Sequence, residues 1–157
     1  DFERIGDHAL NICDSAEEIK QKNIVFSDDA NAEIKIVSDA TVEILNIAID
    51  SFVNDDAKRA AHVEPLEQVI DNLKDTLKAR HVERLQRGEC TIQLGFVFSD
   101  LLTNFERVSD HCSNVAVYTI QLNSSKLDAH KYLRNVKADQ SGAFTEEYAM
   151  YKTKYTV

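Results

Sequence analysis

The chain has 157 residues, 43% of them hydrophobic, which is enough to bury the core of one compact domain. Its formal net charge of −9 argues against a nucleic-acid-binding protein, because binding to a phosphate backbone depends on clustered Lys and Arg. One Pro and four Gly favour long helices, and no stretch approaches the about 18 apolar residues expected of a transmembrane helix.

The first predicted helix covers residues 1–22, where apolar residues recur every three or four positions. A second helix is expected over 28–54. Its start is marked by three residues that are all suitable N-caps: Ser27, Asp28 and Asp29.

A third helix is expected over 57–87, with a kink or break at Pro65, since a proline ring clashes with a helix interior. Gly88 follows in the position that commonly ends a helix. A fourth helix over 91–123 carries an apolar seam at heptad-like spacing. Gly95, near its start, indicates either close helix packing or a frayed first turn.

The tail, 126–157, is less regular, with a short helix expected around 127–136. An aromatic stripe at helical spacing predicts a packing face near its end: Phe144, Tyr148, Tyr151 and Tyr155. No strand pattern competes anywhere in the sequence. The prediction is therefore an all-α antiparallel bundle of three to four long helices with a helical tail.

A motif occurs twice in the sequence. Residues 1–12 read DFERIGDHALNI and residues 104–115 read NFERVSDHCSNV, so that Phe, Glu, Arg, Asp, His and Asn recur at matching offsets. Chance agreement is less common among charged residues than in an apolar run, which favours an internal repeat. Each copy places a Glu and an Asp four residues apart, on one face of a helix: Glu3 with Asp7, and Glu106 with Asp110.

The third predicted helix contributes another such pair, Glu67 and Asp71. A helix turns about 100° per residue, so Glu106 and Asp110 are expected at the shoulder of the bundle, beside its apolar face. Because the third and fourth helices are hairpin neighbours, the four carboxylates would form an oxygen-rich site for a hard or borderline cation. The alternative is a solvated acidic face without a metal.

Histidine follows the motif Asp in both copies, at His8 and His111. These side chains would ligate a metal from the flank, cap a carbonyl or face water. No Glu has a His three residues on, which argues against a buried di-iron centre. No nucleophile and base can be paired, and no glycine-rich phosphate loop is present, so nothing in the sequence requires catalysis.

The phrase Glu-Arg-(Ile/Val)-x-Asp-His, followed by Asn11 and Asn114, resembles the signature of the PhoU family. The resemblance implies two three-helix repeats that hold iron or zinc clusters on the bundle surface through Glu/Asp-x-x-x-Asp pairs. Residues 27–125 would form one complete repeat and 1–26 the last helix of a preceding repeat. Residues 126–157 would form a helical tail.

The tail itself is similar to the end of bacterial Na⁺/phosphate cotransporter proteins, which carry a PhoU-like domain after their membrane part. This similarity implies a non-enzymatic regulatory domain at the cytoplasmic face of the membrane, with the parent transporter as its partner. The three Cys are odd in number and lack Cys-x-x-Cys spacing, in agreement with reduced thiols in the cytosol. The chain is expected to be part of a longer protein.

By this resemblance, metal binding is assigned to six carboxylates: Glu67, Asp71, Glu106, Asp110, Glu3 and Asp7. The pair on the first helix inherits the role only in part, because its partner helix would be absent. Asn104, which stands where the first copy has Asp1, departs from the acidic pattern and weakens the expected outer ligation. The metal would be iron or zinc, with Mg²⁺ or Mn²⁺ as alternatives.

Two other classes of function stay open. A structural adaptor would use exposed apolar surface on the first helix and the tail to bind a partner or a second copy, which predicts a homo-oligomer. A carboxylate–metal hydrolase would need an open metal position and a pocket, and the sequence indicates neither.

Overall fold

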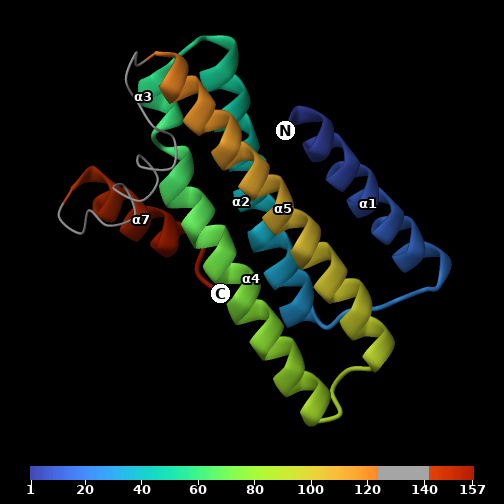
Figure 1. Ribbon diagram of the computed structural model, residues 1–157. Coiled ribbons are helices and arrows are strands. Elements are labelled where there is room, and N and C mark those ends of the chain that lie inside the picture. Colours follow the sequence, from blue (N-terminus) through green and yellow to red (C-terminus); the bar gives the residue numbers. More distant parts are fainter. Residues whose placement is uncertain (124–141) are drawn as a thin grey trace.

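The computed structural model describes residues 1–123 and 142–157, and every regular element in these ranges is a helix (Figure 1). The all-α prediction is therefore confirmed. The short helix expected around 127–136 lies outside the described residues. The helices are α1 (Phe2–Gln21), α2 (Asp28–Val53), α3 (Ala57–Ala60), α4 (Val63–Gln86), α5 (Ile92–Leu122) and α7 (Ala143–Lys154).

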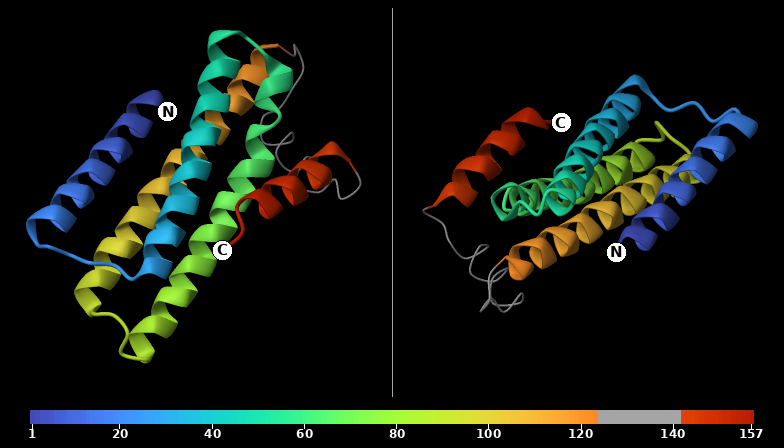
Figure 2. Two further views of the ribbon diagram at one scale, coloured as in Figure 1. Left: turned by 180° about the vertical axis from the view of Figure 1, so that it is seen from behind. Right: turned by 90° about the horizontal axis from the view of Figure 1, so that it is seen from above.

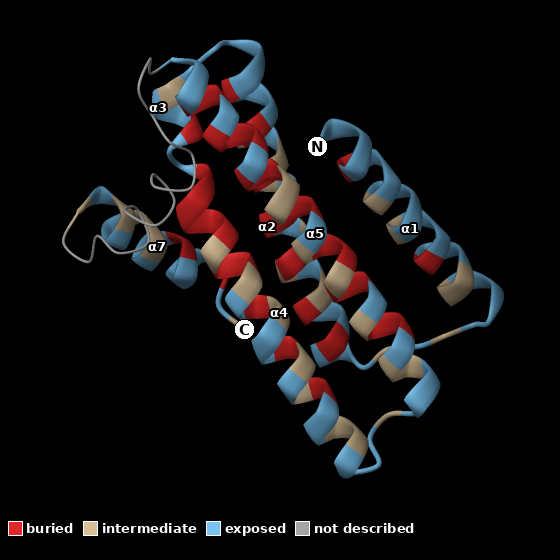
Figure 3. Ribbon diagram, viewed as in Figure 1, coloured by how far each residue is buried: buried red, intermediate tan, exposed pale blue. Residues whose placement is uncertain are grey.

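Three long antiparallel helices, α2, α4 and α5, form the centre of the molecule, with α1 along α5 and α7 on the opposite side (Figure 2). Buried residues concentrate where the three central helices face one another (Figure 3). Each large apolar side chain buried there stabilises the fold by about 1.5–3 kcal/mol. The largest fully buried ones include Phe98, Ile44, Leu66, Ile70 and Leu77.

The helix ends follow local chemistry. The Ser27 hydroxyl accepts a hydrogen bond from the Ala30 amide at 3.2 Å, and the Thr91 hydroxyl accepts one from the Leu94 amide at 3.2 Å. Each bond satisfies an amide that has no partner within its own helix. Gly88, at φ +71°, turns the chain between α4 and α5 in the left-handed region that glycine adopts at little cost.

The predicted break at Pro65 is wrong. The chain instead turns at Ala61 and His62, between α3 and α4, and Pro65 lies in the first turn of α4. Amides in the first turn have no intrahelical acceptor, so a residue without an N–H is tolerated there. Pro65 therefore lies near the start of a helix and does not interrupt one.

Gly95 permits close packing between α4 and α5, one of the two alternatives left open by the sequence. A Cβ atom at this position would lie only 2.7 Å from Nε2 of His81 on α4. The His81 ring in turn stacks on Phe98, with ring centroids 5.0 Å apart. The absence of a side chain at Gly95 thus makes room for a buried imidazole.

Helix α7 packs against α4 through the end of the predicted aromatic stripe. Tyr151 and Tyr155 are buried, and the Tyr155 hydroxyl donates a hydrogen bond to Glu43 of α2. Lys154 also pairs with Glu43, at 2.7 Å. The stripe is therefore a packing face. None of the described helices combines the length and apolar character needed to span a membrane.

Candidate functional site

Carboxylates from α4 and α5 converge on the side chain of Lys74. Its Nζ lies 2.7 Å from Asp71 Oδ1 on α4 and 3.1 Å from Glu106 Oε1 on α5. Asp75 is a more distant partner at 3.7 Å. One carboxylate of each predicted pair, Asp71 on α4 and Glu106 on α5, thus lies beside the same lysine ammonium.

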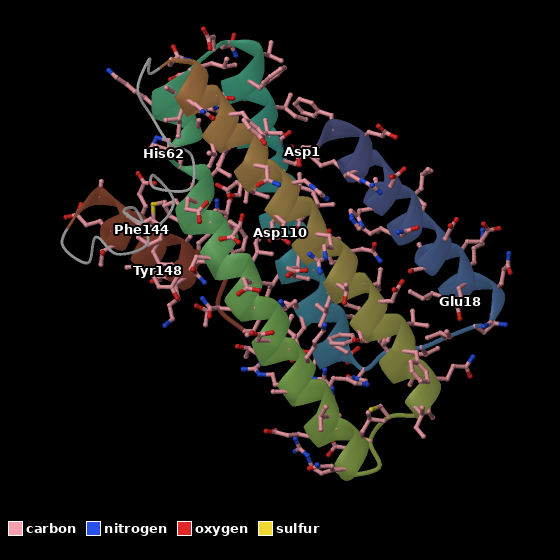
Figure 4. The ribbon with its side chains drawn as sticks, viewed as in Figure 1. Asp1, Glu18, His62, Asp110, Phe144 and Tyr148 are labelled. Carbon is pink, nitrogen blue, oxygen red and sulfur yellow. The ribbon has the colours of Figure 1, made fainter. Side chains whose placement is uncertain are left out.

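Asp110 borders this group from the middle of α5 (Figure 4). Burial raises the pKa of its carboxyl above the ordinary value, and the negative charge of Glu106 raises it further. Asp71 adds to the effect, while Arg107, which pairs with Asp110 at 3.2 Å, opposes it. The ionised form of Asp110 is therefore disfavoured, so additional positive charge would stabilise the cluster.

Lys74 supplies part of that positive charge. Its side chain is only 16% exposed. Burial alone would lower the pKa of its ammonium, but hydrogen bonds to Asp71 and Glu106 outweigh burial and raise the pKa above its usual value. Lys74 is therefore a charged group throughout the neutral range. The pairing of Lys74 with Asp71 could have been predicted from the sequence, because Lys74 stands three residues after Asp71 on the same helix face.

The side chains of this group suit a metal by their chemistry but not by their present arrangement. Carboxylate oxygens are the ligand type that hard and borderline cations require. Their present arrangement, however, is organised around the Lys74 ammonium. Within residues 1–123 and 142–157, no three His, Cys, Asp or Glu side chains converge in a geometry that would hold a metal ion. A metal would have to replace Lys74, and metal binding stays a prediction.

The other predicted ligands lie in different surroundings. Glu67, one turn before Asp71 on α4, is buried, although its angular position had indicated the shoulder of the bundle. Glu3 and Asp7 are exposed on α1, where Arg4 lies 3.8 Å from Asp7. The structure does not bring this pair of α1 into the cluster around Lys74.

The motif histidines join α1 to α5. His8 Nδ1 lies 2.9 Å from Asn104 Oδ1, and His111 Nδ1 lies 2.9 Å from Asp1 Oδ1. Both acceptors are oxygens, so each neutral ring donates from Nδ1. The two rings stack with centroids 5.7 Å apart. The Nδ1 atom of each histidine therefore bonds a side chain of the opposite helix, a role that was not considered from the sequence.

The motif asparagines complete the same contact. Asn11 Nδ2 donates to Asn104 Oδ1 at 3.2 Å, and Asn114 Nδ2 donates to Asp1 Oδ1 at 3.2 Å. Asp1 and Asn104, which differ between the motif copies, thus play the same part as acceptors. We call this set of reciprocal bonds the α1–α5 latch; its residues are Asp1, His8, Asn11, Asn104, His111 and Asn114.

Comparison with known proteins gave one family and two relatives. A family model described as the PhoU domain matches residues 34–119. PhoU homolog 1 of Thermotoga maritima, a phosphate-specific transport system accessory protein, is 28% identical over 143 residues, covering 91% of this chain and 60% of that protein. The corresponding PhoU homolog of Pseudomonas putida is 25% identical over 142 residues, covering 90% and 55%. The chain thus spans little more than half the length of these relatives, and no solved structure matched significantly.

Proposed function

We propose that this chain, which belongs to the PhoU family, is a non-enzymatic regulatory domain in phosphate uptake. Two relatives named as accessory proteins of phosphate-specific transport systems support the proposal. They are longer than this chain, so the activity of a whole relative is not carried over directly. The likeness of the tail to Na⁺/phosphate cotransporter proteins favours such a transporter, at the cytoplasmic face of the membrane, as the partner.

The cluster around Lys74 is the observation that carries a metal-dependent form of this proposal. Four carboxylates, Glu67, Asp71, Glu106 and Asp110, would hold iron or zinc, or else Mg²⁺ or Mn²⁺, once Lys74 moves out. The support is that α4 and α5 each bring a carboxylate within 3.1 Å of one ammonium. The raised pKa of Asp110 indicates that more positive charge would be favourable there.

Metal analysis of protein purified without chelator tests this form directly. The double variant Glu106→Gln/Asp110→Asn is expected to lose the metal that the unmodified chain retains. The matched control is Glu3→Gln/Asp7→Asn, which changes a pair of the same spacing on the exposed surface of α1 and should keep most of the metal. Equal metal content in all three proteins, or none in any, would refute metal binding at this site.

Regulation is tested separately by phosphate uptake. Cells that lack the gene and express either the whole protein or its Glu106→Gln/Asp110→Asn variant would be compared by the rate of labelled phosphate entry at low and high external phosphate. We expect the variant to lose the dependence of uptake on external phosphate while the Glu3→Gln/Asp7→Asn control retains it. Unchanged uptake in both variants would contradict the metal-dependent form alone.

A structural adaptor without metal is the second candidate. It is favoured by large apolar side chains that stay exposed on α1: Leu10 is 65% exposed, and Phe2 is 44% exposed although its ring packs edge-on against Phe52 of α2. Self-association through this face would be weakened by Leu10→Glu and measured by light scattering. A strictly monomeric unmodified chain at high concentration would contradict the predicted homo-oligomer.

A further inference from the structure

An open groove lies between α4 and α5, beside the hairpin that joins them at the lower end of Figure 1. Its volume is about 320 Å³, which is at the small end of the range of small-molecule sites. We call it the α4–α5 groove, and its walls and its inner end are formed by Lys78, Val82, Leu85, Ile92, Phe96 and Ser99.

Gly95 keeps the floor of this groove open. A Cβ atom at Gly95 would lie 2.7 Å from Nε2 of His81 and 3.5 Å from Cδ1 of Leu85, and both of these side chains line the groove. His81 is only 6% exposed, and its ring stacks on Phe98, which is fully buried. The floor is therefore made of side chains that the core holds in place, so the groove is formed without a ligand.

The walls of the α4–α5 groove are apolar and exposed to solvent. Val82 is 50% exposed, Ile92 is 71% exposed and Phe96 is 73% exposed. Large apolar side chains gathered around a concave surface are typical of a site that binds another apolar group. Contact with such a group would remove these three side chains from water, which is favourable.

The polar groups of the groove lie at the end away from the hairpin. Helices α4 and α5 run in opposite directions, so Lys78 of α4 and Ser99 of α5 come together at this end. Lys78 Nζ donates to the Thr103 hydroxyl at 3.2 Å, and no carboxylate in the described part of the chain forms an ion pair with it. This end therefore offers an ammonium and hydroxyl groups to a negatively charged ligand.

We propose that the α4–α5 groove binds a single-chain amphiphilic anion, namely a free medium-chain carboxylate. Its alkyl chain would lie between Val82, Ile92 and Phe96, and its carboxylate would reach Lys78. The helix rises by about 10 Å between Lys78 and Leu85, which limits the length of chain that the groove can cover. The inference does not rest on the metal proposal, because none of the four carboxylates of that site lines the groove.

The charges favour one small anion over an anionic membrane surface. Among the described residues that line the groove, only Lys78 carries a formal charge at neutral pH. Near the hairpin, Arg87 faces two carboxylates, Glu83 at 3.4 Å and Glu89 at 3.8 Å, so the surface beside the groove is not basic. Membranes that contain anionic lipids are bound by clusters of several Lys and Arg.

A series of carboxylates of increasing length tests the alkyl part of the site. Calorimetry would compare hexanoate, octanoate, decanoate and dodecanoate, each below its micelle concentration. The Kd should fall by up to about fourfold for each added CH2 group, and the gain should stop once the chain outgrows the groove. Absence of decanoate binding, or a gain that continues undiminished with every longer chain, would overturn the proposal.

The head group is tested by Lys78→Met, which removes the charge and keeps an apolar side chain. It should weaken decanoate binding by about tenfold or more and leave decanol binding unchanged, because only the carboxylate uses the ammonium. The matched control is Lys35→Met, on an exposed face of α2, which should alter neither affinity. If Lys78→Met weakened decanoate and decanol equally, or neither of them, the proposed orientation would be wrong.

The wall is tested by Ile92→Gln, a change at an exposed side chain that leaves the core intact. It should weaken decanoate and decanol alike, by about fivefold or more. The matched control is Val53→Gln at the end of α2, because Val53 is 72% exposed and Ile92 is 71% exposed. Equal losses in the two variants would show adsorption to any exposed apolar surface and would refute a site in the groove.

NMR of the histidine rings locates the ligand. Decanoate should shift the signals of His81, which lines the groove, and leave those of His62, at the turn between α3 and α4, unchanged. Sedimentation with phosphatidylglycerol vesicles should show no binding. Binding to these vesicles, or self-association, that Ile92→Gln abolishes while decanoate leaves His81 unchanged would overturn the proposal in favour of a membrane or a second copy.

Discussion

At Gly95, the side chain of His81 fills the space that any larger residue would need. We predict that Gly95→Ala lowers the free energy of unfolding by about 1–3 kcal/mol, because the methyl group forces His81 off its stacking partner Phe98. Gly6→Ala is the control. Nothing lies within 4 Å of a Cβ at Gly6 on α1, so the change should stabilise the protein by about 0.5–1 kcal/mol. Urea unfolding measures both; equal effects would show that Gly95 does not limit packing.

The titration of His81 also makes the free energy of unfolding depend on pH. Burial lowers its pKa below the ordinary value of 6.5 and the Arg84 charge lowers it further, while Glu33 opposes both. The neutral ring is therefore the form that the folded protein favours, so its contribution to stability is complete above pH 6.5 and is lost as the pH falls through the folded pKa. We expect His81→Gln to flatten the fall in unfolding free energy between pH 7.5 and 5.

The prediction would be contradicted if the unfolding free energy of His81→Gln fell with decreasing pH as steeply as that of the unmodified chain. His111 also has a pKa lowered by burial, and then by the charge of His8. The double variant His81→Gln/His111→Gln therefore separates the two contributions, and the remaining slope belongs to the carboxylates and the other groups.

Lys74 is the residue whose removal distinguishes an acidic scaffold from a metal site. We predict that Lys74→Met, measured with chelator, lowers the free energy of unfolding by about 1–2 kcal/mol, because Asp71 and Glu106 lose their shared cation. Zn²⁺ or Mn²⁺ should restore this loss and bind more tightly than to the unmodified chain. The control is Lys78→Met, one turn on, whose Nζ bonds the Thr103 hydroxyl at 3.2 Å. Absence of any metal-dependent recovery would support the scaffold.

At the scale of helices, a buried ion pair joins α2 to α4. Glu33 is 4% exposed and accepts hydrogen bonds from Arg84 at 3.1 and 2.7 Å and from Arg80 at 3.3 Å. The Arg84 guanidinium also lies 5.5 Å above the Phe98 ring. Both helices thus depend on one carboxylate that has little access to water.

We predict that Glu33→Gln destabilises the protein by about 3–5 kcal/mol, because it leaves the partly buried Arg84 charge without its partner. The matched control is Asp39→Asn on the same helix, which breaks an exposed pair with Lys35 and should cost less than about 1 kcal/mol. Thermal unfolding followed by circular dichroism measures both changes. Similar costs for the two variants would show that the buried pair contributes no more than the exposed one.

Helix pairing also explains the motif that occurs twice. Its first residue, His and Asn bond the opposite copy, whereas the Glu of the α5 copy, Glu106, bonds Lys74 of α4. One short sequence therefore supplies two surfaces: a contact between α1 and α5, and, on α5, a border of the Lys74 cluster. Spacing within a helix predicted that Glu106 and Asp110 share a face of α5, but the contact between the copies could be recognised only with α1 and α5 side by side.

At the scale of the whole molecule, the arrangement of the helices predicts that α1 has a lower local stability than α5. The amides of α1 should exchange with solvent faster than those in the middle of α5, because α1 is held chiefly by one helix and buries little of its surface. Hydrogen exchange followed by mass spectrometry measures this difference. Protection of α1 equal to that of the peptides around Phe98 and Leu102 would contradict this prediction.

The predicted PhoU resemblance is confirmed by the family match over residues 34–119. The metal and the transporter partner remain predictions. The helix ends could be predicted closely because caps and glycine turns act within a few residues, as Ser27, Thr91 and Gly88 show. Pro65 was misjudged because its effect depends on where its helix begins, which the turn at Ala61 and His62 decides.

The sequence by itself determined the all-α class, the long helices and the carboxylate pairs, since these follow from spacing along one helix. Only the tertiary structure decided that Lys74 lies between Asp71 and Glu106, and that His8 and His111 stack between two helices. The reason is physical. Contacts across helices depend on how each helix is rotated and shifted against its neighbour, and the packing of the whole core sets that relation.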